Sequence, residues 1–269
     1  MKNLIFQYFI PPKNTDSMSG FLKHELDIAL EYGNAPKWAK LSASLFKQYA
    51  DKHGADHIFA TEEFCNVPIP QHECNRVWLD PSFDQYDYVL SVDPDIIPVN
   101  MSANIFDLPY KDADIAGWPI ENFKGRKLPA IYFSGKEYEA YKQLFGMFGA
   151  DMPRSQRGTA RFRLLNGGVI VWSKKARLFA RENFISPHFW CNLRFDNTNK
   201  MSRYNKEQPY LNININKSKL KVFELKQEWN QVWHGRWQDK YNIPKANFIH
   251  YAGCLERDAE MYEKWKHLL

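Results

Sequence analysis

Short apolar runs alternate with amphipathic segments along most of the chain. The run 4–10 ends at a pair of prolines, as a strand entering a loop does, and apolar positions recur at helical spacing between Pro36 and Gly54. Further strands are predicted at 56–61, 86–92, 114–118, 164–172, 221–225 and 248–253, and helices at 136–148, 174–183, 207–214 and 258–268. Because strands alternate with helices, the pattern predicts an α/β fold with an open, mostly parallel sheet.

Composition and charge narrow the class of protein. The 269 residues are 44% hydrophobic, enough for a core, and the net charge of +5 is spread along the chain. That surplus suits an anionic small ligand and argues against nucleic acid as a partner. The apolar runs are far shorter than the about 20 residues that span a bilayer, and no cleavage site follows the first strand. We therefore expect a soluble, cytoplasmic protein.

The four cysteines show no spacing typical of a metal site. They predict reduced thiols, with a Cys65–Cys74 bridge as the alternative. The basic stretch 154–163 is either a solvated loop or a mobile flap over an anion. Gly167 and Gly168 interrupt an apolar strand, which indicates a bulge or a close approach of the backbone to a ligand.

The candidate chemistry centres on two acids, Asp93 and Asp95, which flank one proline. They follow the apolar run 86–92 directly, so both carboxylates stand at the end of a buried strand, where an unpaired charge is costly. A divalent cation that prefers oxygen ligands resolves that cost and can hold a diphosphate. The alternative is a turn with capping acids. A second pair, Asp112 and Asp114, precedes its strand and is interpreted as solvated loop acids.

Around these acids the chain resembles the GT-A fold, metal-dependent glycosyltransferases that use nucleotide sugars, with glycogenin-like and xyloglucan xylosyltransferase-like motifs. The matching segments, in order, are 86–97, 113–119, 165–172, 207–208 and 248–253. The resemblance implies a GT-A (Rossmann-like) α/β fold, with a mixed, mostly parallel central sheet flanked by helices. It also implies a single domain, 1–269, whose parts are a nucleotide-binding half (1–118), a variable flap or insertion (119–163) and a donor-sugar and acceptor half (164–269).

The resemblance also implies a metal site and a donor site. Asp93, Asp95 and His250 would hold Mn²⁺ or Mg²⁺, although a hydrogen-bonded core histidine is the alternative for His250. The nucleotide and the donor sugar would be met by Tyr8, Arg76, Asp93, Asp95, Trp118, Asn166, Gly167 and Gln208. Trp118 would also form a wall on the acceptor side. For Tyr8 and Arg76 the alternative is an ordinary core or surface position.

Glu207 is the candidate catalytic residue. As a general base near the acceptor hydroxyl it would lead to inversion, whereas proton transfer to the departing phosphate oxygen would lead to retention, and the sequence leaves both open. The chain departs from the family pattern at two places. Pro209 stands where a second acid is usual, and Arg257 follows the last strand where a lysine is usual.

The implied activity is transfer of a sugar, with xylose, glucose or galactose as candidates, from a UDP-sugar to a hydroxyl of a glycan or glycoprotein. Aromatic stretches at 188–190 and 229–237 either contact the acceptor or pack the core. Two alternatives are a nucleotidyltransferase that makes a nucleotide sugar and a non-catalytic sugar- or nucleotide-binding module of the same fold.

Overall fold

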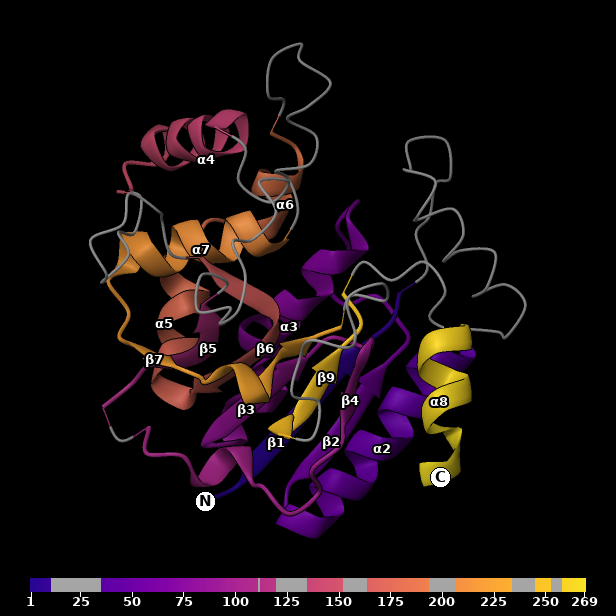
Figure 1. Cartoon of the computed structure of the whole chain (residues 1–269). Coiled ribbons are helices and arrows are strands. Elements are labelled where there is room, and N and C mark those ends of the chain that lie inside the picture. Colours follow the sequence, from indigo (N-terminus) through magenta and orange to yellow (C-terminus); the bar gives the residue numbers. More distant parts are fainter. Residues whose placement is uncertain are drawn as a thin grey trace.

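A six-stranded central sheet organises the chain (Figure 1). The computed structural model describes residues 1–10, 35–110, 112–119, 135–151, 164–193, 207–233, 245–252 and 258–269. In spatial order the strands are β2 (Asp56–Ala60), β1 (Asn3–Tyr8), β3 (Tyr88–Val92), β6 (Leu165–Ser173), β5 (Ile115–Pro119) and β7 (Val222–Glu224). Within this sheet only β6 runs antiparallel to its neighbours. The predicted mixed, mostly parallel α/β sheet is therefore confirmed.

A second, three-stranded sheet stands at the carboxyl end of β3. Its strands, in spatial order, are β4 (Ile96–Pro98), β9 (Phe248–His250) and β8 (Gln231–Val232). Strand β4 begins immediately after Asp95 and pairs antiparallel with β9, so that Ile96 lies opposite His250. The sequence predicted β9 but neither β4 nor β8, which are too short to show a periodic pattern.

Helices pack around the sheets at most of the predicted places. The α-helices are α2 (Lys37–His53), α3 (Arg76–Leu79), α4 (Gly135–Met147), α5 (Lys174–Asn183), α6 (Pro187–Cys191), α7 (Glu207–Ser218) and α8 (Glu263–Trp265). Shorter helical turns cover Pro70–Asn75, Pro81–Gln85, Ile105–Asp107, Gln227–Trp229, Asp258–Tyr262 and Lys266–Leu268. Helices α2 and α8 lie together on one side, while α4, α6 and α7 group at the upper end of the sheet (Figure 1).

The helix boundaries follow local chemistry. Gly54 has a φ of 65°, a left-handed conformation that ends α2 where the sequence predicted. The single helix predicted at 258–268 is instead a π-helical turn, then α8, then a 3-10 turn. No described helix combines the length and the apolar character that crossing a bilayer requires.

The central sheet is buried on both faces. Leu4 and Phe6 of β1 belong to one hydrophobic cluster, whereas Ile5 between them belongs to another. Successive strand residues point to opposite faces. Because both faces are covered, β1 reads as a continuous apolar run and not as an alternating one.

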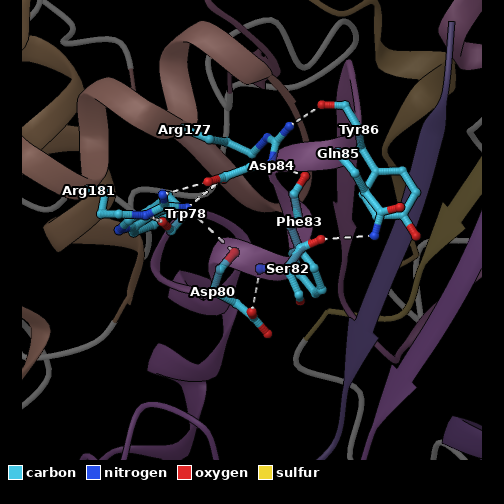
Figure 2. A network of polar contacts seen from close by, with 9 residues as sticks. All are labelled: Trp78, Asp80, Ser82, Phe83, Asp84, Gln85, Tyr86, Arg177 and Arg181. Atoms are coloured by element: carbon cyan, nitrogen blue, oxygen red, sulfur yellow. Dashed lines mark hydrogen bonds and ion pairs between the residues drawn. The ribbon is translucent and has the colours of Figure 1, made fainter.

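Helix α5 fixes the turn that leads into β3 (Figure 2). The fully buried Arg177 donates hydrogen bonds to the backbone oxygens of Phe83, at 2.8 Å, and Tyr86. One turn further on, Arg181 holds both carboxylate oxygens of Asp84 at 2.6 and 2.8 Å. This network sets the starting point of the strand that carries Asp93.

The acid Asp114 corrects a sequence interpretation. It is 7% exposed and accepts hydrogen bonds from Lys175 Nζ, at 3.0 Å, and from the backbone nitrogen of Lys221, at 2.9 Å. Burial alone would raise the pKa of Asp114, but these two partners together bring it below its ordinary value. Through these bonds Asp114 joins the start of β5 to β7 and α5, so the interpretation of Asp114 as a solvated loop acid is wrong. Asp112 is exposed, as that interpretation expected.

The thiols Cys65, Cys74 and Cys191 are free. Cys254, Arg257, Trp237 and the stretch 154–163 lie outside the described residues.

Candidate active site

Three side chains from two sheets converge at the carboxyl end of β3. Nε2 of His250 lies 3.2 Å from Oδ1 of Asp95 and 3.8 Å from Oδ2 of Asp93. One ligand atom from each of the three falls within 4.8 Å of the others. Asp95 and His250 are buried, and Asp93 is partly exposed, so the group has one side toward solvent. The structure therefore brings together the three residues that the sequence assigned to a metal.

Backbone pairing explains why residues so distant in sequence meet. The nitrogen of Asp93 donates to the oxygen of Gly168 in β6, at 2.9 Å. The oxygen of Asp95 accepts from the nitrogen of Tyr251, directly after β9, also at 2.9 Å. The turn that carries the two acids is thus held between β6 on one side and β9 on the other.

A buried polar pair supports the same turn from β1 and α2. Ser42 donates from Oγ to the backbone oxygen of Ile96 at 2.6 Å, and Gln7 donates from Nε2 to Ser42 Oγ at 2.9 Å. Both side chains are fully buried. Neither was predicted from the sequence, because a single buried Gln or Ser has no spacing that distinguishes it.

The donor set fits a divalent cation. Two carboxylates supply the oxygen ligands that Mg²⁺ and Mn²⁺ prefer, and an imidazole nitrogen is an accepted ligand for Mn²⁺. Two carboxylates gathered in a mostly buried site repel each other unless positive charge accompanies them. Asp93, Asp95 and His250 are therefore the described residues that would hold such an ion.

Two asparagines lie behind His250. Asn230, fully buried, places Oδ1 2.9 Å from His250 Nδ1. Its Nδ2 lies 2.8 Å from Oδ1 of Asn166, which also accepts from the backbone nitrogen of Gly168 at 2.9 Å. The family resemblance implied a contact of Asn166 with the donor sugar, whereas Asn230 was not predicted.

Helix α7 carries Glu207 to the start of β6. Asn212 of α7 accepts from the nitrogen of Leu165, at 2.7 Å, and donates to its oxygen, at 3.0 Å, which joins helix and strand. A Cβ atom at Gly167 would meet Glu207 at 3.9 Å, so the acid flanks this glycine. An acid in the first turn is also favoured by the helix dipole. Gln208, the next residue, is partly exposed.

Tyr8 is buried at the end of β1. Its hydroxyl donates to the backbone oxygen of Gln71 at 2.8 Å. Burial, and then the neighbouring charges of Cys74, Asp93 and Glu207, raise the pKa of Tyr8 well above its ordinary value. Gly167 faces Glu207 and Gly168 faces His250, so the start of α7 and the cluster of Asp93, Asp95 and His250 border adjacent residues of β6.

Arg76 and Trp118 have surroundings that the sequence did not predict. Arg76 pairs with Asp80, Nε to Oδ2 at 2.9 Å, and its guanidinium lies 4.9 Å from the ring centre of Phe64. Trp118 is 1% exposed and belongs to a core cluster. Its position therefore gives no support to a wall on the acceptor side, and the donor role of Arg76 stays a prediction.

The aromatic stretches divide between core and surface. Trp190, Trp229 and Trp233 are buried, with Trp190 against Tyr210 of α7. Phe189, by contrast, is 56% exposed. The described tryptophans therefore pack the core, the second of the two interpretations of these stretches.

Comparison with known proteins places the fold. No family model and no curated protein matches the sequence. Among solved structures, a glycosyltransferase involved in the glycosylation of the major capsid of PBCV-1 matches with a TM-score of 0.51 at 13% identity, over 97% of this chain and 98% of that one. The galactosyltransferase LgtC, solved with donor and acceptor sugar analogs, has a TM-score of 0.44 at 13% identity, over 99% and 100%. Mouse xyloside xylosyltransferase 1 has a TM-score of 0.39 at 12% identity, over 94% and 98%. At these identities the likeness concerns the fold alone, and the chain has the GT-A fold of glycosyltransferases.

Proposed function

We propose that the protein is a glycosyltransferase that moves a sugar from a UDP-sugar to a hydroxyl of a glycan or glycoprotein. Xylose, glucose and galactose are the candidate sugars, and Mn²⁺ or Mg²⁺ is the candidate ion. The proposal rests above all on the convergence of Asp93, Asp95 and His250 at the carboxyl end of β3. In open α/β sheets this end of the strands is where ligands bind.

Different residues around this site can bind the ion and the donor sugar during the transfer. When bound, a divalent cation supplies positive charge that stabilises the departing diphosphate. Asp93 and Asp95 would hold it on the side of β3, and His250 on the side of β9. In this proposal Asn166, Gly167 and the first turn of α7 border the donor sugar, and the absence of a side chain at Gly167 lets the sugar approach the backbone.

Two roles are open to Glu207, and they predict different products. If a carboxylate oxygen of Glu207 takes the proton of the acceptor hydroxyl, attack comes from the face opposite the leaving group and the anomeric centre inverts. If the acid only positions the sugar, the leaving phosphate takes the proton and the configuration is retained. The anomeric configuration of the product, measured by NMR, distinguishes these roles.

A screen of nucleotide sugars with Mn²⁺ tests the proposal. We expect released UDP with at least one sugar, and no detectable turnover by Asp95→Asn, which keeps the shape of the side chain but removes a charged ligand. Asp112→Asn is the matched control, because Asp112 is an exposed acid of the other Asp-x-Asp pair. It should retain the parental rate.

Three outcomes would contradict the proposal. Full turnover by a folded Asp95→Asn variant would remove the metal assignment. Release of pyrophosphate from a sugar phosphate and UTP would favour the nucleotidyltransferase. Binding of UDP-sugars with no hydrolysis or transfer across the screen would favour a binding module.

A further inference from the structure

A chain of three hydrogen bonds runs from the backbone of β6 to the ring of His250. The nitrogen of Gly168 donates to Oδ1 of Asn166 at 2.9 Å, Asn230 lies 2.8 Å from the same oxygen, and the far end of Asn230 lies 2.9 Å from His250 Nδ1. Asn230 is fully buried and His250 is 3% exposed, so the bond between these two side chains is shielded from water, whereas Asn166 is partly exposed. The three side chains come from β6, from the residue before β8, and from β9.

The backbone nitrogen at one end determines the direction of every bond in the chain. A backbone N–H can only donate, so the atom of Asn166 that meets Gly168 must be its oxygen. That oxygen can only accept, so Asn230 must present its NH₂ group to Asn166. The opposite end of the Asn230 amide is then its oxygen, which can only accept from His250. Nδ1 of His250 therefore carries a proton.

We propose that Asn230 is a positioning residue which, through Asn166 and the Gly168 backbone, keeps the proton of His250 on Nδ1. The lone pair of Nε2 then faces the side of Asp93 and Asp95, where the proposed ion would bind. This inference rests on the proposed metal site and deepens it. The outer hydrogen bond of a ligating histidine sets its tautomer, its ring orientation and its basicity. Nothing in the sequence pattern marks Asn230 for this part.

The orientation matters because a competing hydrogen bond lies on the other side of the ring. Oδ1 of Asp95 is 3.2 Å from Nε2, a distance at which a neutral ring could donate from Nε2 to that carboxylate. A proton on Nε2 would block the lone pair that a metal needs. The asparagine chain opposes this, since Nδ1 faces an oxygen and would lose its hydrogen bond if it gave up the proton.

The tautomer can be measured directly, without activity and without metal. Long-range ¹H–¹⁵N correlation spectra of the metal-free protein, at a pH where the His250 ring is neutral, report which nitrogen is protonated; His250→Gln identifies the signal. We expect Nδ1–H in the parent protein. In Asn230→Leu, which keeps the branched shape at a larger volume and removes both polar ends, we expect the proton on Nε2, beside Asp95.

Two further variants keep the inference falsifiable if Asn230→Leu folds poorly. Asn230→Asp retains an acceptor for Nδ1 and should keep the Nδ1–H form. Asn214→Leu is the matched control, because Asn214 of α7 is also a buried amide. It accepts from the backbone nitrogen of Ile185 and donates to the backbone oxygen of Tyr210. It should leave the His250 spectrum unchanged.

Binding of Mn²⁺ alone, followed by EPR, gives a second measurement. We expect Asn230→Leu to weaken binding about 10–100-fold and Asn214→Leu to leave it unchanged. An Nε2–H ring in the parent protein, or an unchanged tautomer and Mn²⁺ affinity in Asn230→Leu, would overturn the inference. If the parent protein shows Nδ1–H, shifted by Asn230→Leu, but binds no Mn²⁺, the control of the tautomer stands and the proposed metal-dependent function fails.

Discussion

The ring of His250 occupies the space that a side chain at Gly168 would fill. A Cβ atom at this glycine would lie 2.5 Å from Cε1 of His250 and 2.9 Å from Nδ1, closer than packed atoms approach. The absence of a side chain in β6 thus allows the imidazole of β9 to reach the two acids after β3. The strand that pairs with the acid-bearing turn is also the one that makes room for the third ligand.

Gly168→Ala should therefore disturb the cluster of Asp93, Asp95 and His250. The added methyl group must push the His250 ring away from Asp95 or shift the backbone of β6, and overpacking of this kind costs about 1–3 kcal/mol of unfolding free energy. We expect Mn²⁺ affinity to fall about tenfold or more, measured by EPR, together with a lower midpoint in urea unfolding.

Gly167→Ala is the matched control for this substitution. A Cβ atom there meets only Glu207, at 3.9 Å, which is ordinary contact, and neither glycine has a positive φ that alanine would resist. We expect parental stability and parental Mn²⁺ affinity. Equal losses in the two variants would contradict the claim that His250 requires the space at Gly168.

Gly167 and Gly168 illustrate which features of the site could be predicted from the sequence and which could not. Their interruption of an apolar run predicted either a bulge or a close approach of the backbone to a ligand. The pairing of β5 with β6 does shift its register across this stretch, from Gly117 opposite Ile170 to Pro119 opposite Leu165. For Gly168 the group that approaches is a side chain of the same protein, whereas the prediction named a ligand. Glycines in an apolar run indicate that some group comes close to the backbone, but they do not identify it. Here the group is His250 of β9, which is distant in sequence and is brought to β6 by the pairing of β4 with β9.

Other parts of the site escaped prediction for a related reason. Buried strands show short apolar runs and long helices such as α2 show a repeated pattern, and the ends of both were predicted to within a few residues. Asn230 and Gln7 are single buried amides, and an isolated amide has no spacing that distinguishes it from a solvated one. Their function depends on which backbone or side-chain groups face them, and that is set only when the sheets assemble.

Arg177 should prove important for stability and not for the site itself. Arg177→Met leaves the backbone oxygens of Phe83 and Tyr86 without their buried donor, although it also removes a buried charge whose pKa burial lowers to about 10. The net expected loss is about 2–4 kcal/mol in urea unfolding. Mn²⁺ affinity of the folded protein should stay within about twofold, because the network acts at the start of β3.

Lys175→Met provides the comparison on the same helix. Its pair with the buried Asp114 spans 3.0 Å, but the lysine side chain is 82% exposed, so solvent screens the pair and its loss should cost under about 1 kcal/mol. A loss as large as that of Arg177→Met would contradict the structural assignment of Arg177.

Asn212 should control how well α7 is held to β6. Asn212→Leu removes both hydrogen bonds to Leu165, which leaves two buried backbone groups unpaired at a cost of about 2–3 kcal/mol. Because the same bonds hold the helix that carries Glu207, we expect turnover of the donor found in the nucleotide-sugar screen to fall more than Mn²⁺ affinity does. Asn214→Leu, roughly half a turn away on the same helix, should lose stability but keep turnover.

The partly buried imidazole of His57 should make stability depend on pH. Nε2 of His57 lies 3.1 Å from Oε1 of Gln7, and burial, followed by the charge of Lys47, lowers the pKa of His57 to about 4. The unfolded chain binds this proton more readily, so stability is complete above about pH 6.5 and falls as the pH drops toward 4. From this group alone we expect a loss of about 1–2 kcal/mol in unfolding free energy between pH 7 and pH 5.

Urea unfolding at the two pH values measures this loss. In His57→Gln, whose side chain cannot titrate, the difference between the two pH values should be smaller by that amount. Identical differences in parent and variant would mean that His57 takes up its proton as easily in the folded protein as in the unfolded chain.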